Sequence, residues 1–321
     1  MAEHNIVRGG QRASRQATRT ASPWARLRWV AAVVGAATVL ASCGTVPGAA
    51  VAIDGTEVST MTVRDRVAEV AGADAAADAD TLAAQARAQL TTIIRHQLAR
   101  AAAEKNGISV TDADVNTYIS QYDAYQRSTA GAQDMSTVLG VTADDLAATS
   151  YDLLVLDKLV SAIPADGVDV TDVDVTVDAV PAATWADAVA ARNKYLADPA
   201  AMNTDAAAAL AANPQLPGGH ESLLEQPQHA AFGIFSAAAG EILLVPQGTQ
   251  GYLVVRITER TEKPSKLTVQ MIGTAAQSAG LSGQIAIASL LLGPEARQTH
   301  IELNPRFGVW DPRIVQVVAG R

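Results

Sequence analysis

The stretch "DGVDVTDVDVTVDAV", residues 166–180, separates two parts of the chain that differ in sequence pattern. Its valines alternate with polar residues at a period of two, which predicts a β-strand with one apolar face. We expect the acidic run from Asp166 to Asp178 to form a solvated face. The sequence before this stretch has helical periodicity, whereas the sequence after it mixes strand and helix patterns. The chain therefore reads as α+β.

Before this stretch, "AVAIDGTEVS" (residues 50–59) predicts a strand, a tight turn at Asp54-Gly55 and a helix cap at Ser59. Residues 72–80 repeat alanine and aspartate and are expected to form a loop. A long helix is predicted over residues 81–104, and two further helices begin at capping pairs. The apolar stripe of the long helix is Leu90, Ile94 and Leu98, and the capping pairs are Thr111 with Asp114 and Thr142 with Asp145.

After the alternating stretch, the pattern predicts a small α+β unit and then a third segment. The unit consists of a helix over 184–202, a loop over 213–228, a short helix within 230–240 and a strand over 251–260. The third segment consists of a helix over 281–298, broken near Pro294, and a strand within "IELNPRFGVWDP", residues 301–312.

The N-terminus has the pattern of an export signal. Six arginines and one acid occupy residues 1–28, and residues 29–41 are free of charge. This run of 13 residues is shorter than the roughly 20 that span a bilayer, so we interpret it as a secretory signal. It ends in Leu40-Ala41-Ser42-Cys43, which resembles a bacterial lipobox and contains the single cysteine of the chain. The resemblance implies that Cys43 is lipidated and anchors the protein to the extracytoplasmic face of the cell membrane.

Charge and composition exclude several classes of function. The chain has a formal net charge of −9 and no cluster of Lys and Arg after residue 28, so we expect no nucleic-acid partner. One cysteine excludes an internal disulfide framework and a thiolate zinc cluster. His220 and His229 lie nine residues apart near two glutamates, without the spacing of a metal site, so we predict no metal and no cofactor.

The order of these elements resembles foldases of the SurA/PrsA type. "VAIDGTEVS" followed by helices and "GISVTDADVNTYI" is similar to the N-terminal chaperone module of the family, and "IELNPRFGVW" (residues 301–310) is similar to its returning terminal strand. The resemblance implies that this strand pairs with the one around residues 51–53, so that both ends of the chain build a mostly helical module. It predicts a signal peptide over 1–42, a lipidated tether over 43–50, the helical module over 51–164, an inserted α+β domain over 165–262 and a C-terminal helix and strand over 263–321.

The inserted domain resembles a parvulin-type prolyl isomerase. "GGHESL" lies at a family turn, and "AAFGIFSAAAGEILLVPQGTQGYLVVRI" fits the family's helix, Gly-Glu turn and last strand. Such an isomerase needs a polar cluster beside a proline pocket, because the site must bind a twisted peptide bond whose barrier is about 20 kcal/mol. Every position that can be aligned departs from this pattern, so the domain looks degenerate. These positions are Asp178, His220, Gln226, Ala230 and Leu253.

The sequence therefore predicts a lipid-anchored chaperone that holds unfolded or newly secreted polypeptides in an apolar groove, without catalytic residues. Tyr118, Tyr122 and Tyr125 are candidates for lining that groove, although packing between helices explains them somewhat better. Two alternatives stay open: a working prolyl isomerase with a rearranged site at Asp178 or His220, and a purely structural lipoprotein of the cell envelope.

Overall fold

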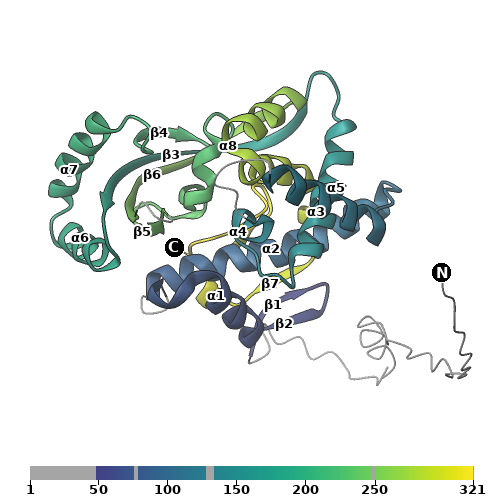
Figure 1. The fold of residues 1–321 in the computed structure, drawn as a ribbon, viewed down its shortest axis with the longest axis horizontal. Coiled ribbons are helices and arrows are strands. Elements are labelled where there is room, and N and C mark those ends of the chain that lie inside the picture. The colour runs from purple at the N-terminus through teal and green to yellow at the C-terminus, as the bar shows by residue number, and fades with distance from the viewer. Residues whose placement is uncertain (1–47, 76–78, 128–133, 248–250, 321) are drawn as a thin grey trace, which may run out of the picture. The chain divides into compact units, whose positions relative to one another are not determined.

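The computed structural model describes residues 48–75, 79–127, 134–247 and 251–320. All of them belong to one compact unit, which runs from Thr45 to Arg321. A helical N-terminal part, a four-stranded sheet and a set of C-terminal strands build this unit (Figure 1). The α+β fold class is confirmed.

The N-terminal hairpin has the predicted turn. Strands β1 (Ala49–Ile53) and β2 (Thr56–Ser59) pair in antiparallel fashion. Asp54 and Gly55 both have positive φ, at 46° and 80°, which a two-residue turn of type I′ requires. The Ser59 hydroxyl then accepts a hydrogen bond from the Thr62 N–H at 3.0 Å and caps α1 (Thr60–Ala75). The expected loop over 72–80 was too long, because α1 continues to Ala75 and the next helix begins at Ala79.

The long helix α2 (Ala79–Lys105) is the centre of the helical part. Leu90, Ile94 and Leu98 are fully buried, as their spacing predicted. The helices α3 (Asp112–Arg127), α4 (Met135–Leu139) and α5 (Leu146–Ser161) follow. Both predicted capping pairs form: the Thr111 and Thr142 hydroxyls donate to Asp114 and Asp145 at 2.7 and 2.8 Å.

The second part of the unit is an antiparallel sheet whose strand order is β4-β3-β6-β5. The alternating stretch becomes β3 (Val168–Ala182), which pairs along its whole length with β6 (Tyr252–Leu267). The remaining elements of this part are α6 (Trp185–Ala197), α7 (Pro199–Ala212), β4 (Gly219–Ser222), the 3-10 turns η2 (Pro227–Phe232) and η3 (Ile234–Ser236), and β5 (Ile242–Pro246).

Three expectations for this part were wrong in detail. The single helix over 184–202 is two helices, because Asp198 ends α6 and caps α7, whose first residue is Pro199. The expected loop over 213–228 contains β4, which pairs with β3 through His220 and Glu221. The strand expected over 251–260 is longer, because β6 continues to Leu267, and β5 was not predicted.

The two faces of the sheet bury different clusters. Val173, Val175, Val177 and Ala179 on β3 join the large core that also contains the α2 stripe. The opposite face packs on α6 and α7 through a smaller cluster that includes Leu244, Val254 and Tyr195. α6 and α7 lie at the end of the sheet away from α8 (Figure 1).

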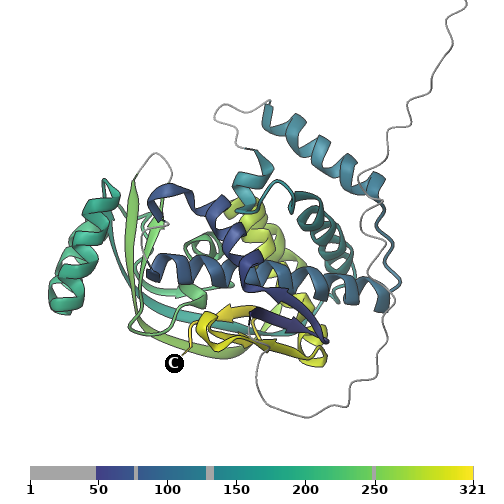
Figure 2. The same ribbon diagram turned by 90° about the horizontal axis from the view of Figure 1, so that it is seen from below.

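The C-terminal segment returns to the N-terminal hairpin. Helix α8 (Val269–Ala288) begins at the capping residue Thr268, earlier than expected, and leads through η5 (Ser289–Leu292) and α9 (Gly293–Gln298) into β7 (Ile301–Leu303). β7 pairs with β1 in the register Val51↔Leu303 and Ile53↔Ile301, so the predicted closure of the chain ends is confirmed (Figure 2).

The last strands do not extend this pairing. After the turn η6 (Pro305–Phe307), β8 (Val309–Asp311) pairs with β9 (Gln316–Val318) to form a separate hairpin. The Val317 N–H donates to the Thr91 hydroxyl on α2 at 2.9 Å, and the Arg95 Nε donates to the Val315 carbonyl at 3.0 Å. These bonds attach the hairpin to α2.

One helical stretch of the described residues, Val269–Gln298, is long and apolar enough to cross a membrane by length and composition. Of its most apolar window, 44% is buried inside the structure. A core helix passes the same test, so this stretch is weak support for a membrane span.

The conformation of Gly308, in the turn before β8, predicts the effect of a substitution on stability. Gly308 has a φ of 120°, and a Cβ added there would lie 2.1 Å from the Val318 carbonyl oxygen. We expect Gly308→Ala to lower the free energy of unfolding by about 2 kcal/mol, measured by urea denaturation. Gly320→Ala is the matched control, because the nearest atom to its added Cβ is 4.0 Å away. Equal stability of the two variants would contradict the strained geometry.

Candidate functional site

A groove of about 560 Å³ lies between the helical part and the sheet. One wall consists of α2, α4 and α5, and the other consists of η2, η3 and β5, with residues of α8 and β9 between them. Apolar side chains dominate both walls. They include Leu153, Leu156, Phe232, Leu243, Val245, Ile285 and Leu292.

The polar side of the groove comes mainly from α2. Arg87, Thr91 and Arg95 follow one another at intervals of four residues and therefore lie on one face of the helix. Arg87 forms an ion pair with Glu241, the residue that precedes β5, and so connects α2 to the sheet. Gln89 donates from Nε2 to the Gly140 carbonyl at 3.1 Å. Its Oε1 and the Nε of Arg87 are buried without a hydrogen-bond partner.

A second cavity, of about 420 Å³, adjoins the groove on the other side of α2 and α5. It contains an ion pair between Arg66 and Asp145 at 2.6 Å and a hydrogen bond between His96 and Asp152 at 2.7 Å. Asp152 borders both the cavity and the groove.

Burial perturbs the two ionisable groups at this border. Desolvation raises the pKa of Asp152 above its ordinary value, although the hydrogen bond from His96 and the charges of Arg100 and Arg95 oppose the rise. Burial lowers the pKa of Arg95 to about 10, with the Asp152 charge acting in the opposite direction. Arg95 therefore stays charged at neutral pH, and its Nη2 has no hydrogen-bond partner.

The five positions aligned with the isomerase site do not converge. Leu253 is buried in the large core, where its neighbours across the sheet are Pro181 and Val245. Asp178 lies on the opposite face of the sheet and pairs with Arg256 at 2.5 Å. His220 is exposed on β4, and its Nε2 lies 3.7 Å from Asp174.

The remaining two positions have different roles. Gln226 accepts a hydrogen bond from the Ser222 N–H at 2.7 Å, which fixes the turn after β4. Ala230 lines the groove, and it is the only one of the five positions among the lining residues of this groove. A histidine missed by the alignment, His229, donates from Nδ1 to the Glu221 carboxylate at 2.8 Å and stacks on Phe232, which lines the groove.

The acidic run of β3 is not a uniformly solvated face, so that expectation was wrong. Asp172 is 2% exposed and accepts hydrogen bonds from the Ser222 hydroxyl and the Leu224 N–H at 2.8 and 3.2 Å. Asp174 is also buried and pairs with Lys263 at 2.7 Å. Partners from β4 and β6 offset the desolvation of these carboxylates. Asp169 pairs with Lys266 and remains exposed.

The candidate tyrosines lie on α3 and are absent from the residues that line the groove. Tyr118 and Tyr122 are half-buried, and Tyr125 is 66% exposed. Burial and the charge of Asp157 on α5 raise the pKa of Tyr118, as expected for a ring packed against that helix. A groove lined by these tyrosines stays a prediction.

The structure bears on metal ligation but not on lipidation at Cys43. No group of three or more His, Cys, Asp or Glu side chains that could hold a metal ion occurs among the described residues. Cys43 and its preceding Leu40, Ala41 and Ser42 lie outside the described residues.

Comparison with known proteins supports the class suggested by the chain order. Residues 19–139 match the family model of the SurA-like N-terminal domain. Residues 19–139 are therefore similar to a SurA-like N-terminal domain, in agreement with the resemblance seen in the sequence. No curated protein sequence matches the chain significantly.

A solved structure from Campylobacter jejuni also matches. It belongs to a study of the virulence factor PEB4 and the periplasmic protein Cj1289, described as two structurally related SurA-like chaperones. The sequence identity is 11%, the match covers 80% of this chain and 99% of that chain, and the TM-score is 0.26. A TM-score this low supports no inference about function.

The raised pKa of Asp152 predicts a dependence of stability on pH. The folded state holds this proton more tightly than the unfolded state, so the free energy of unfolding falls as pH rises from about 4, the ordinary pKa of Asp, through the raised pKa. We expect Asp152→Asn to show a smaller fall over this range, measured by urea denaturation at a series of pH values.

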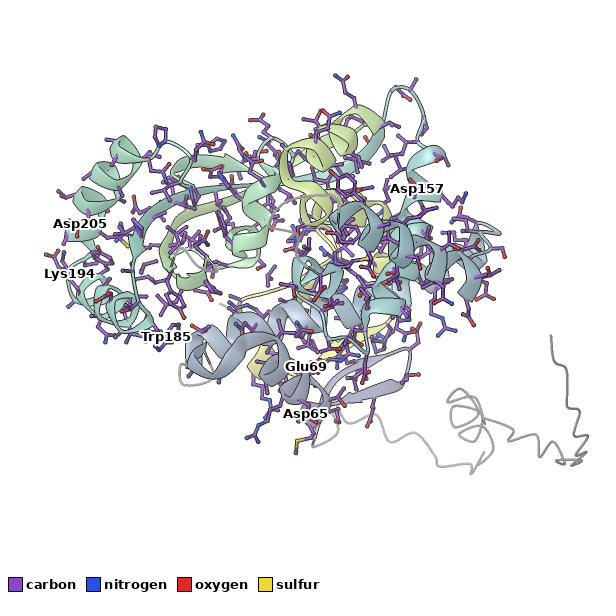
Figure 3. The ribbon with its side chains drawn as sticks, viewed as in Figure 1. Asp65, Glu69, Asp157, Trp185, Lys194 and Asp205 are labelled. Carbon is purple, nitrogen blue, oxygen red and sulfur yellow. The ribbon has the colours of Figure 1, made fainter. Side chains whose placement is uncertain are left out.

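The control for this measurement is Asp157→Asn, which removes an exposed carboxylate from the same helix (Figure 3). It should leave the pH dependence of the wild type unchanged. A slope that is the same in all three proteins would mean that Asp152 titrates normally.

Proposed function

We propose that this protein is an extracytoplasmic chaperone that binds unfolded or newly secreted polypeptides in the groove between α2 and β5. The observation that carries this proposal is the groove itself, because about 560 Å³ lies between two parts of the fold and apolar side chains dominate its walls. The SurA-like N-terminal domain over residues 19–139 agrees with such a role.

The chemistry of the groove suits a client of variable sequence. Leucine, valine and phenylalanine side chains bind apolar segments without a directional requirement. Alanine, glycine, serine and threonine provide part of the lining and leave room for client side chains of different size. Binding to many sequences with modest affinity is what a holding chaperone needs.

The proposal includes no prolyl isomerase turnover. The element order β3, α6, α7, β4, two 3-10 turns, β5, β6 supports the resemblance to a parvulin domain. The positions expected to twist a prolyl bond, however, are occupied by Leu253 in the core and by Asp178 on the other face of the sheet. Without a polar cluster beside the apolar pocket, the domain can bind a polypeptide but cannot stabilise a twisted amide.

We also propose that Cys43 carries a lipid that anchors the protein to the extracytoplasmic face of the cell membrane. The Leu-Ala-Ser-Cys sequence after an uncharged run supports this anchor. Without the signal, the chain has a net charge of −14, so anionic headgroups would repel the protein surface and the lipid would have to supply the attachment.

The groove predicts how surface variants affect holding activity. Val70 lines the groove and is 37% exposed, so Val70→Asp should preserve the fold while placing a charge on the apolar wall. We expect the concentration that half-suppresses aggregation of heat-denatured citrate synthase to rise roughly threefold. Val269→Asp is the matched control, because Val269 is a helical valine that is 49% exposed and lies outside the groove lining.

Two results would contradict the proposal. Absence of suppression by the wild-type protein at several-fold excess would favour a structural lipoprotein. Turnover of an Xaa-Pro peptide above the uncatalysed rate in a protease-coupled assay would restore the isomerase alternative, and its loss in His220→Ala would locate that site.

The anchor has a direct test in cells. Cys43→Ser removes the only thiol, so we expect the exported protein to move from the membrane pellet to the soluble extracytoplasmic fraction. Metabolic labelling with a fatty-acid analogue should mark the wild type and leave the variant unmarked. A variant that still sediments with membranes would exclude lipid at Cys43 as the attachment.

A further inference from the structure

The strand β5 is an edge of the four-stranded sheet. One side of β5 pairs with β6, and in the order β4-β3-β6-β5 no strand from the described residues lies on its other side. Residues 243–246 of this strand line the groove. An unpaired strand edge is a template for another extended chain, and most proteins protect such edges.

Hydrogen-bonded and non-bonded residue pairs alternate between β5 and β6, and this alternation identifies which main-chain groups of β5 face away from β6. The Gln247 N–H donates to the Gly251 carbonyl at 2.8 Å, and the Ile257 N–H donates to the Glu241 carbonyl at 3.0 Å. Bonded and non-bonded pairs alternate along an antiparallel ladder. The main-chain groups of Leu243 and Val245 therefore point to β6, whereas those of Leu244 and Pro246 point outward.

The outward groups border the groove. The Leu244 side chain belongs to the cluster beneath α6, on the other face of the sheet, yet Leu244 also lines the groove. Its main-chain groups point away from β6 on that side of the strand. Within the described part of the chain, no hydrogen bond uses the Leu244 N–H. Pro246 has no N–H, which is tolerated because this position needs no donor to β6.

The opposite wall of the groove also has unused hydrogen-bonding atoms. Four side chains of α2 that line the groove each have a buried polar atom without a partner. They are the acceptors Gln85 Oε1 and Gln89 Oε1 and the donors Arg87 Nε and Arg95 Nη2. Arg87 and Gln89 are each more than nine-tenths buried, at 8% and 4% exposure. Buried polar atoms without partners are uncommon, and a set of donors and acceptors together matches the alternating groups of a peptide backbone.

We propose that an extended segment of the client polypeptide adds to the free edge of β5 as a fifth strand, an inference that rests on the proposed chaperone function. The Leu244 N–H donates to a client carbonyl, and the carbonyls of Leu244 and Pro246 accept from client N–H groups. Alternate client side chains then point to the apolar wall of the groove. The main chain of the client supplies the hydrogen bonds, so recognition tolerates many sequences.

Amide hydrogen exchange tests this inference in the intact protein. The probe is reduced and carboxymethylated α-lactalbumin, a permanently unfolded polypeptide, whose binding is followed separately by fluorescence anisotropy. We expect saturating probe to slow exchange of the Leu244 amide about tenfold or more. The amides of Leu243 and Val245 already donate to β6, so their exchange should change much less.

A pair of variants provides an independent measurement. Leu244→Pro removes the outward N–H without removing a β5–β6 hydrogen bond, and Leu244→Ala removes the same buried side chain but keeps the N–H. We expect Leu244→Pro to bind the probe about five- to tenfold more weakly than Leu244→Ala. If Leu244→Pro fails to fold, the exchange measurement on the wild type decides.

The outcomes separate this inference from the proposed function. Probe that binds while the Leu244 amide exchanges at its free rate would overturn strand addition and leave the chaperone role intact. Equal binding by the two Leu244 variants would overturn it as well. Absence of any binding would overturn both.

Discussion

Burial of one face of α2 is the constraint on which the rest of the structure depends. Leu90, Ile94 and Leu98 are fully enclosed because elements from every other part of the chain pack around this helix. Polar side chains on its neighbouring faces then connect those elements individually. Thr91 and Arg95 bind the C-terminal hairpin, Arg87 pairs with Glu241 beside the sheet, and Lys105 pairs with Glu295 on α9 at 2.9 Å. A shift of α2 would therefore break its contacts with both the sheet and the C-terminal strands.

The same arrangement explains how a groove can persist in a protein with few aromatic residues. Aromatic residues make up 4% of the chain, so the protein has few large rings with which to fill a space between two layers. Small side chains, the buried Arg87 and the half-buried Arg95 line the interface between α2 and β5 instead, and the ion pair at Glu241 fixes the separation of the walls at one end. The desolvated border at Asp152 and Arg95 costs stability, which is common where a protein reserves a surface for binding.

Local signals in the sequence predicted local structure well. The Asp54-Gly55 turn, the Thr111 and Thr142 caps and the α2 stripe depend on residues within a few positions of one another, so periodicity and turn chemistry suffice. The boundary between α6 and α7 at Asp198-Pro199 could also have been predicted, because aspartate before proline is a helix-start signal. The burial of Asp172 could not be predicted from the sequence, since its hydrogen-bond partner Ser222 is 50 residues away. The sequence predicted an apolar groove but not the residues of α2 and β5 that line it, because these elements come together only in the folded state. The four-residue spacing of Arg87, Thr91 and Arg95 was the available clue.

The pairing of β1 with β7 has a consequence for biogenesis. The two strands are about 250 positions apart, so the pairing between them forms only after both have been synthesised. The hydrogen bonds of Thr91 and Arg95 to the C-terminal hairpin likewise form only after residues 315–317 have been synthesised. Translation from the N-terminus therefore completes the first helices before the strands that cover them exist, and a chain that stops before residue 301 lacks that covering.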